Sequence, residues 1–524
     1  MAEQPKGPAA TGSANGGTAA RPGAHHDHLE VESTFAAGAG FTLPDLADLA
    51  PGGIEARRHR LGATYFDTGG LRLAARGITL RRRLGGGDAG WHLKIPWERG
   101  AKREFTAPPG THSRRVPARL SRLASSASRG APLEPVARIT TRRTEYALRA
   151  ADGTVLALVA DDRVTGEVLA GPAERREWRE VEVELGAGDR RLAERAADRL
   201  LSAGAAPSAT GSKLLTLLGG RVPGPRPRPS GGTAADAVLG YLHDQLEQMV
   251  DLGPRVRTGE YDSVHRMRVC TRRLRAVLGG LPGAVDRAAV RGPLEDLRAL
   301  ASALGEARDL EVLRERFASR LDALPDRLAG TRLRSDWLEA VDRRHRAAEQ
   351  AAVRAVDGPG HAALLDALER LLDDPPPGER AGEPAADVLG DLLGGARARL
   401  RRDRRRAEEA STGPDERRDA AWHRVRKSAK RLRYTATLAE PYLGARAARL
   451  RTWAAELQQA LGDHQDGVAA VDFLGRHGSR LAASSGDRAS AAATLAALAA
   501  AEAAEGPHRI AAARRIWKRA PAGG

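Results

Sequence analysis

The spacing of apolar residues changes once along this chain of 524 residues, at a proline-rich segment. Before residue 220, apolar and polar residues alternate in short runs such as EVEVEL at residues 180–185, whereas after residue 233 apolar residues recur every three or four positions. Alternation predicts β-strands, and the longer spacing predicts amphipathic helices. The proline-rich segment can form neither a regular helix nor a central strand. We therefore expect a β-rich domain at 28–219 and an all-helical domain at 233–520, joined by a linker at 220–232.

The helical half contains a duplicated sequence. The stretch HRMRVCTRRLR at residues 265–275 returns as HRVRKSAKRLR at residues 423–433. Each copy is followed by an LG-x-x-x-D segment, the first at residues 304–309 and the second at residues 461–466. Similarity repeated at a fixed offset is typical of internal duplication. We expect two related sets of helices.

Each copy of the repeat concentrates positive charge on one side of its helix. At 100° per residue, the basic side carries His265, Arg268, Arg272 and Arg275 in the first copy, and His423, Arg426, Lys430 and Arg433 in the second. Such stacked cations repel each other unless an anion neutralises them. A single basic face is often only solvated, but two copies favour a polyanion site. Metal binding by the histidines is disfavoured because the neighbouring groups are cations.

The overall composition limits the partners. The net charge of +17 points to an acidic partner, which means nucleic acid, an anionic membrane or polyphosphate. Aromatic residues make up only 4% of the chain, so base stacking and nucleic acid binding are not expected. No stretch approaches the roughly 18 apolar residues of a membrane span, and Cys270 stands alone, so no internal disulfide forms. We expect a cytoplasmic protein whose oligomeric state the sequence does not specify.

Residues 1–27 are rich in glycine, alanine and proline and are expected to be a disordered tail. The histidines at its end, His25 and His26, together with His28, suggest at most a weak metal site.

The polar residues of the β-rich half are segregated by charge. Some expected strands present only acids (Glu30 and Glu32), and another presents only Arg81 and Arg83. If the strands closed into a barrel, these side chains would share one interior, where carboxylates can hold a divalent cation and arginines can grip phosphate. An open antiparallel sheet with a polar outer face accounts for the alternation equally well.

A series of short motifs covers nearly the whole of this half. They are Glu30-x-Glu32, Tyr65-Phe66-Asp67-Thr68, Leu80-Arg81-Arg82-Arg83, Leu93-Lys94, Thr141-x-Arg143, Asp161, the acidic strand at 180–185 and Ser212-Lys213. Together they resemble the CYTH domain, the fold of the triphosphate tunnel metalloenzymes. The resemblance implies an eight-stranded antiparallel β-barrel tunnel in an α+β chain. It also implies Glu30 and Glu32 as catalytic residues and Mg²⁺ or Mn²⁺ held by Glu30, Glu32, Asp161, Glu182 and Glu184. The implied triphosphate-binding residues are Arg81, Arg83, Lys94, Arg143 and Lys213.

One position departs from the pattern of this family. The motif E-x-E-x-K ends here in Thr34. Two interpretations therefore stay open: a metal-dependent hydrolase of inorganic triphosphate or polyphosphate ends, and a non-catalytic polyphosphate-binding or targeting protein. Near loops, the alternation also leaves open whether Arg142 or Arg143, and Lys102 or Arg103, faces inward.

The helical half resembles the CHAD domain, the conserved histidine α-helical domain, through its two histidine-led helices and two LG-x-x-x-D segments. The resemblance implies two related four-helix bundles and frequent fusion to a CYTH domain. It also implies binding of inorganic polyphosphate, possible location at polyphosphate granules, and contacts from His265, Arg268, Arg272, Arg275, His423, Arg426, Lys430 and Arg433.

Overall fold

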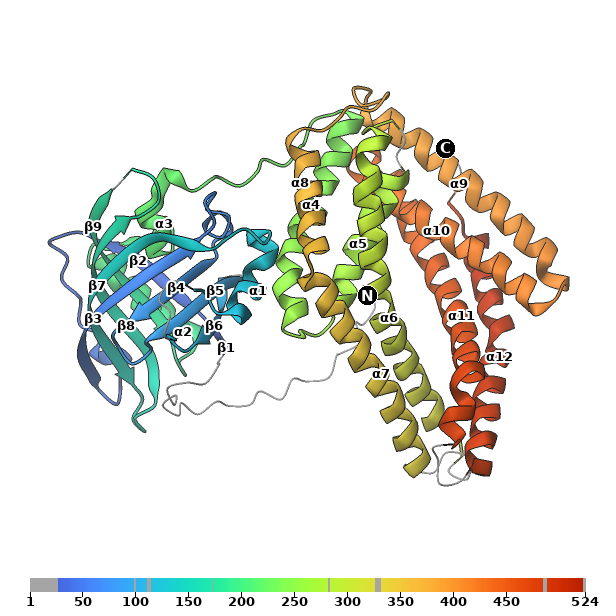
Figure 1. Cartoon of the computed structure of the whole chain (residues 1–524), viewed down its shortest axis with the longest axis horizontal. Coiled ribbons are helices and arrows are strands. Elements are labelled where there is room, and N and C mark those ends of the chain that lie inside the picture. Colours follow the sequence, from blue (N-terminus) through green and yellow to red (C-terminus); the bar gives the residue numbers. More distant parts are fainter. Residues whose placement is uncertain are drawn as a thin grey trace. The chain divides into compact units, whose positions relative to one another are not determined.

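The chain divides into two compact units, one ending at Pro225 and the other beginning at Arg226. The computed structural model describes residues 27–98, 100–110, 115–172, 174–280, 283–325, 331–483 and 488–521. The tail predicted for residues 1–27 lies outside the described residues, except for Asp27, which begins the first strand. The expected α+β chain, with an N-terminal antiparallel sheet and a C-terminal helical domain, is confirmed (Figure 1).

The described residues of the first unit form one antiparallel sheet of ten strands in the order β1-β6-β5-β4-β3-β7-β8-β9-β2-β10. Its strands are β1 (Asp27–Glu30), β2 (Glu32–Ala37), β3 (Ile54–Asp67), β4 (Thr79–Leu84), β5 (Gly90–Glu98), β6 (Ala101–Ala107), β7 (Glu134–Arg149), β8 (Val155–Val168), β9 (Arg175–Leu185) and β10 (Ala206–Pro207). The strand predicted at residues 180–185 lies within β9, whereas the alternating run that contains Glu30 and Glu32 is divided between β1 and β2.

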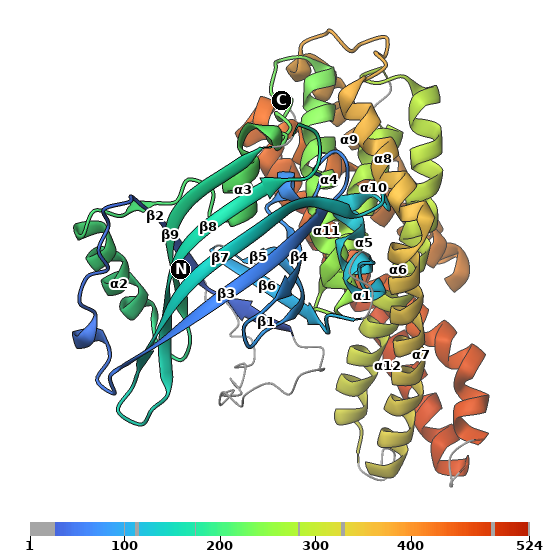
Figure 2. The same ribbon diagram turned by 60° about the vertical axis from the view of Figure 1, so that its left-hand side comes forward.

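The predicted closed barrel of eight strands was wrong. Val31 interrupts the first strand, so that β1 pairs with β6 and β2 pairs with β9 while the sheet remains an open ladder. β1 is the strand at one end of the sheet, and β2 lies next to β10 at the other end. Because only Val31 separates β1 from β2 in the chain, the two ends of the sheet lie close together. The sheet therefore curls around an interior (Figure 2).

Helices cover parts of this sheet. They are α1 (Ala118–Ser128), α2 (Arg190–Ser202) and α3 (Lys213–Leu218), with short 3-10 turns at Ala47–Leu49, Ala74–Arg76 and Gly219–Arg221. α2 packs Leu192, Ala196 and Leu200 against Val181 and Val183, which point to the outer face. α3 packs Leu214, Leu217 and Leu218 into a cluster with Val164 and Ile139. Val164 lies on the same face of β8 as Asp162, whose side chain is fully buried inside the curled sheet. This second cluster therefore lies on the inner face of the sheet.

The second unit is helical. Its elements are α4 (Ala234–Arg257), α5 (Ser263–Gly280), α6 (Arg287–Asp322), α7 (Thr331–Asp357), α8 (Pro359–Asp373), α9 (Ala385–Glu409), a 3-10 turn (Ala410–Thr412), α10 (Asp415–Leu443), α11 (Ala445–Ala483) and α12 (Arg488–Lys518). The two histidine-led repeats occupy α5 and α10, and the two LG-x-x-x-D segments lie in the helices that follow, α6 and α11. Each helix from α4 to α8 packs against the next, as does each helix from α9 to α12, and α10 also contacts α5.

Some helix boundaries differ from those predicted. The helical spacing predicts separate helices at 293–304 and 310–324, and again at 446–461 and from 467 onwards, but α6 and α11 run through Gly305 and Gly462 without a break. The glycines and proline at 358–360 predict only a break between helices, so α8 is not expected from the sequence. Pro359 is in fact the first residue of α8, a position that suits proline because that N–H needs no partner within the helix. In the described part of the chain, no helix is both long enough and apolar enough to cross a membrane.

Candidate functional site

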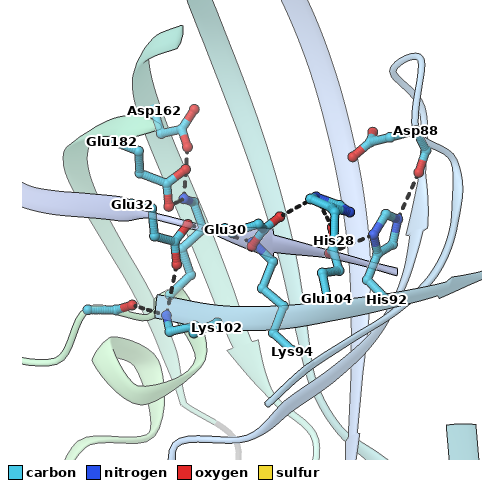
Figure 3. A network of polar contacts seen from close by, with 12 residues as sticks. His28, Glu30, Glu32, Asp88, His92, Lys94, Lys102, Glu104, Asp162 and Glu182 are labelled. Atoms are coloured by element: carbon cyan, nitrogen blue, oxygen red, sulfur yellow. Dashed lines mark hydrogen bonds and ion pairs between the residues drawn. The ribbon is translucent and has the colours of Figure 1, made fainter. Parts of the chain in front are cut away.

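The interior of the curled sheet collects charged side chains from both of its ends. Lys94 on β5 places its Nζ 2.5 Å from Glu30 and 3.6 Å from Glu32. Lys102 on β6 donates to Glu32 at 2.8 Å and to the Gly211 carbonyl at 3.1 Å. Figure 3 shows these two lysines reaching Glu30 and Glu32. The acids of the Glu30-x-Glu32 motif therefore face a shared set of cations, as the sequence predicted for a common interior.

A second group comes from β7, β8, β9 and α3. Arg143 forms a two-bond contact with Asp162, at 2.8 and 2.7 Å, and lies 2.5 Å from Glu182. Lys213 at the start of α3 places its Nζ 2.8 Å from Asp162, 2.7 Å from Glu180 and 2.6 Å from Glu182. Burial alone would lower the pKa of Lys213, but these carboxylates raise it. Lys213 and Arg143 likewise hold the pKa of Glu182 well below its usual range despite burial.

A third group surrounds Glu104 on β6. His92 Nδ1 lies 2.9 Å from Glu104, and His92 Nε2 donates to the Asp88 carbonyl at 2.8 Å. His28 on β1 lies 3.4 Å from Glu30 and 3.6 Å from Glu104, as Figure 3 shows. Burial would raise the pKa of Glu104, but His92 and Lys94 hold it well below its usual range. This group joins the histidines to the Glu30 end of the interior.

Three further predicted residues also face the interior. Arg81 lies opposite Tyr65 on β3, and its buried Nε has no hydrogen-bond partner. Arg83 contacts Asp88, while burial and the neighbouring Arg81 lower the pKa of Arg83. Glu184 on β9 faces Glu32 across the ladder. Burial and the nearby Glu30 raise the pKa of Glu184 to about 7.

The structure does not bring Asp161 to this interior. Asp161 is ion-paired with Arg179 at 2.8 Å, on the opposite face from its neighbour Asp162, which is fully buried inside. The register also settles two alternatives that the sequence left open: Arg143 and Lys102 face the interior, whereas Arg142 and Arg103 do not.

Several interior residues were missing from the predicted site. They are His28, Asp88, His92, Lys102, Glu104, Asp162 and Glu180. The inward direction of Lys102 and Glu104 could have been predicted, because they alternate with apolar or outward-facing residues along β6. Glu104 also pairs with the inward-facing Lys94 on β5.

Two groups of side chains have ligand atoms close enough together for one metal ion. They are His28, Glu30 and Glu104, and Asp162, Glu180 and Glu182. Carboxylate oxygens are the ligands that Mg²⁺ and Mn²⁺ prefer, and the buried Glu30 Oε2 is paired with the ammonium of Lys94 at 2.5 Å, whose place a metal cation could take. The residues therefore fit a hard divalent cation. In the second group, the ammonium of Lys213 contacts all three carboxylates.

The helical unit gathers the basic sides of α5 and α10 at one place. Burial, Arg272 and Arg268 of α5 all act to lower the pKa of Arg426 on α10. Burial and the neighbouring Arg426, Arg272 and Arg268 lower the pKa of Lys430 to about 7. Arg272 also stacks over the ring of Tyr434 on α10, 5.7 Å from its centre. We call Arg268, Arg272, Arg426 and Lys430 the basic cluster.

The polar atoms around the basic cluster are poorly satisfied. Four buried nitrogen atoms have no hydrogen-bond partner among the described residues: His265 Nδ1, Arg272 Nε, His423 Nδ1 and Arg426 Nε. Burial lowers the pKa of both histidines, so both tend to be neutral. Buried polar atoms without partners are rare in folded proteins, so their concentration here makes this surface a candidate binding site.

The remaining predicted residues lie at the margin of the basic cluster. Arg433 stacks over Tyr434 at 5.0 Å, and Arg275 is exposed. The LG-x-x-x-D segments support the cluster, because Asp309 pairs with Arg268 at 3.2 Å and Asp466 acts electrostatically on Arg426.

A curled antiparallel sheet with a charged interior, joined to a helical domain with a duplicated basic helix, defines a two-domain class of protein. A family model described as the CYTH domain matches residues 28–209, and one described as the CHAD domain matches residues 240–475. The chain therefore belongs to the family of proteins that join a CYTH domain to a CHAD domain, and the predicted fusion is confirmed.

The chain is similar to known proteins over most of its length. It is 38% identical over 471 residues to "Uncharacterized protein Rv2226" of Mycobacterium tuberculosis, covering 85% of this chain and 88% of that protein. Among solved structures, PptA from Streptomyces chartreusis matches with a TM-score of 0.45 and 19% identity, over 55% of this chain and 99% of that chain. The CHAD domain from the plant Ricinus communis matches with a TM-score of 0.43 and 22% identity, over 54% of this chain and 90% of that chain.

Proposed function

We propose that the CYTH unit is a metal-dependent hydrolase of inorganic triphosphate or polyphosphate ends, and that the CHAD unit binds long-chain polyphosphate. The observation that carries the first part is the meeting of acids and bases in one interior. Glu30 and Glu32 lie on one side, Asp162 and Glu182 on another, and Lys94, Arg143 and Lys213 lie between or beside them. A triphosphate with its metal matches both signs of charge.

The proposed roles follow from this arrangement. Mg²⁺ or Mn²⁺, when bound, would neutralise phosphate charge and lower the pKa of a bound water. Glu30, Glu32, Glu182 and Glu184 would hold the ion, and Asp162 would replace the predicted Asp161. Arg81, Arg83, Lys94, Arg143 and Lys213 would bind phosphate oxygens as point charges or forked donors. Such a site works by positioning and charge neutralisation of the phosphoryl group.

The family motif has a lysine at the position of Thr34, but a cation still lies near this position in the structure. Thr34 pairs with Glu182 across the ladder, and Lys213 already contacts Glu182 at 2.6 Å. An ammonium therefore lies beside the same carboxylate that a lysine at position 34 would approach. This favours catalysis over the alternative of a purely phosphate-binding interior.

Release of phosphate from tripolyphosphate tests the catalytic part. We expect metal-dependent release by the full chain and a loss of at least about 100-fold in Glu30→Gln/Glu32→Gln, more than the loss of an outer-shell partner of a metal ligand. Glu194→Gln on α2, exposed and away from the interior, serves as the control. Equal rates in the chain with intact acids and in the double variant would refute hydrolysis in this interior.

The basic cluster carries the polyphosphate part of the proposal. Four cations from two helices converge, and buried donors around them lack partners. We expect Arg272→Gln/Lys430→Gln to weaken binding of long-chain polyphosphate by at least about tenfold, as for two lost phosphate contacts. Arg287→Gln/Arg291→Gln, exposed at the start of α6, removes two arginine charges elsewhere. Equal losses in both pairs would mean that only net charge matters. A cytoplasmic location at polyphosphate granules stays a prediction from the sequence.

A further inference from the structure

A row of arginines crosses the outer face of the CYTH sheet, away from the charged interior. The strand register places Arg60 on β3 opposite Arg142 on β7, Arg142 opposite Arg163 on β8, and Arg163 opposite Arg179 on β9. These four strands lie side by side in Figure 2. Like charges directly opposite each other in a sheet are destabilising. Four in succession therefore call for an explanation.

Within the described part of the chain, a single member of the row is neutralised. Arg179 pairs with Asp161 at 2.8 Å, donates to the Phe41 carbonyl and stacks on the Phe41 ring, beside the apolar cluster under α2. Among the described residues, Arg60, Arg142 and Arg163 form no ion pair, and all three are exposed. Three free guanidiniums thus span two strand spacings, roughly 10 Å.

The acids nearby do not neutralise the row, because each is paired elsewhere. Glu167 contacts Arg138 at 3.3 Å, Glu177 contacts Arg175 at 3.0 Å, and Glu174 contacts Arg221 at 3.0 Å. Together with the row, these acids line a groove of about 1030 Å³ on the sheet surface. The groove therefore has free positive charge along its floor and neutralised pairs around it.

We propose that this groove is a further polyphosphate-binding site, which holds a stretch of polyphosphate outside the charged interior of the sheet. The free row suits a linear anion with one charge per unit, because each guanidinium offers a fork of donors to phosphate oxygens. Polyphosphate is favoured over nucleic acid because the groove offers no free aromatic face for bases. Its one aromatic residue, Trp178, donates to Glu180 at 2.6 Å and packs on the inner cluster. The choice of ligand rests on the proposed function.

Binding of long-chain polyphosphate to the full chain tests this site, in a background where Arg272→Gln/Lys430→Gln removes the basic cluster. Adding Arg142→Gln/Arg163→Gln is expected to weaken the remaining binding by about tenfold, the effect of two lost surface contacts. The matched control is Arg122→Gln/Arg191→Gln, two exposed arginines off the row, which should change little. Equal effects of the two pairs, or no binding at all in the background, would overturn the proposal.

Arginine modification by phenylglyoxal, read by mass spectrometry, locates the ligand without any variant. Long-chain polyphosphate should slow modification of Arg60, Arg142 and Arg163 several-fold but leave Arg122 and Arg191 unchanged. Protection of the basic cluster without protection of the row would overturn this proposal and leave the proposed function standing. Protection by duplex DNA but not by polyphosphate would also overturn it. Loss of hydrolysis or of binding at the basic cluster is measured separately and bears only on the proposed function.

Discussion

In each unit, one titratable residue lies where its surroundings destabilise the charged form of its side chain. Glu184 lies among other acids in the interior of the sheet, and Lys430 lies among arginines on α10. Burial and like-charged neighbours shift both pKa values to about 7 from opposite directions. In each case a ligand of the opposite charge would remove the conflict. Both residues are therefore sensitive to pH and to ligand.

Glu184 is expected to make the stability of the metal-free protein depend on pH. The folded protein retains a proton on Glu184 up to about pH 7, whereas the unfolded chain releases it near pH 4.3. The stabilisation from this retained proton is therefore complete below about pH 4 and is lost as pH rises through about 7, by at most about 4 kcal/mol. Urea unfolding at pH 5 and pH 8 should show a smaller decline for Glu184→Gln. Parallel declines would contradict the shifted pKa.

Lys430 is expected to couple polyphosphate binding to proton uptake. Because its pKa is lowered to about 7 in the free protein, a bound polyanion should restore the charge, and affinity should fall as pH rises from 6 to 8. Lys430→Arg keeps its charge throughout this range, so its affinity should stay constant. Titration of binding at several pH values, at fixed salt, makes the comparison. A wild-type affinity as flat as that of the arginine variant would exclude Lys430 as the titrating group.

The identity of the inward residues could be predicted only where one face of a strand is polar. Glu30, Glu32 and Lys94 follow clear alternation, and their convergence was expected. Around Asp161 and Asp162, β8 has apolar residues on both faces, because Val159 packs under α2 while Ala160 lies inside. In such a strand, the pattern of apolar and polar residues does not show which side chains point inward. Asp161 was predicted from the family resemblance, whereas the register places Asp162 beside Glu180.

At the scale of elements, α3 is the piece that completes the charged interior. It inserts Lys213 among Asp162, Glu180 and Glu182 and buries Leu214 and Leu217. Lys213→Met would leave three buried carboxylates without their shared cation, which should destabilise the metal-free protein by about 3–5 kcal/mol. Mg²⁺ or Mn²⁺ should recover much of this loss, because a cation can take the place of the ammonium. Thermal unfolding with and without metal measures both effects.

Leu217→Ala is the matched control for this prediction. It weakens the docking of α3 through a lost apolar contact, by about 2–5 kcal/mol, but leaves every carboxylate paired. Metal should therefore stabilise Leu217→Ala no more than the wild type. Equal rescue of both variants would show that the metal acts elsewhere.

The elements differed in how far their sequence determined them. The switch from alternation to helical spacing identified both domains, but the break at Val31 has no signal, since Glu30-Val31-Glu32 alternates without interruption. Gly305 and Gly462 suggested helix ends because glycine is a poor helix former. The helices continue through them, and a Cβ atom added at Gly305 or Gly462 would lie 3.8 or 3.7 Å from the side chain of Arg268 or Arg426. Tertiary packing overrides local propensity at these positions.

At the scale of the whole molecule, a short linker joins the two units, each of which gathers basic side chains at its proposed phosphate-binding site. Part of the linker is held by the helical unit, since Arg226 contacts Glu369 at 3.1 Å and Arg228 contacts Asp244 at 2.9 Å. Only a few residues before Arg226 remain to connect the units. If both units bind one polyphosphate chain, as proposed, binding to one unit raises the local concentration of that chain at the other.

Lengthening the linker tests this coupling. A flexible Gly-Ser insertion of about 20 residues after Gly224 should lower the effective concentration by about tenfold, following its −3/2 power dependence on linker length. Hydrolysis of long-chain polyphosphate at low concentration should slow accordingly. Hydrolysis of tripolyphosphate, which needs only the interior of the sheet, should keep its rate. If both substrates were affected alike, the insertion would be acting on the fold of the CYTH unit, and if neither changed, the two units would be binding polyphosphate independently.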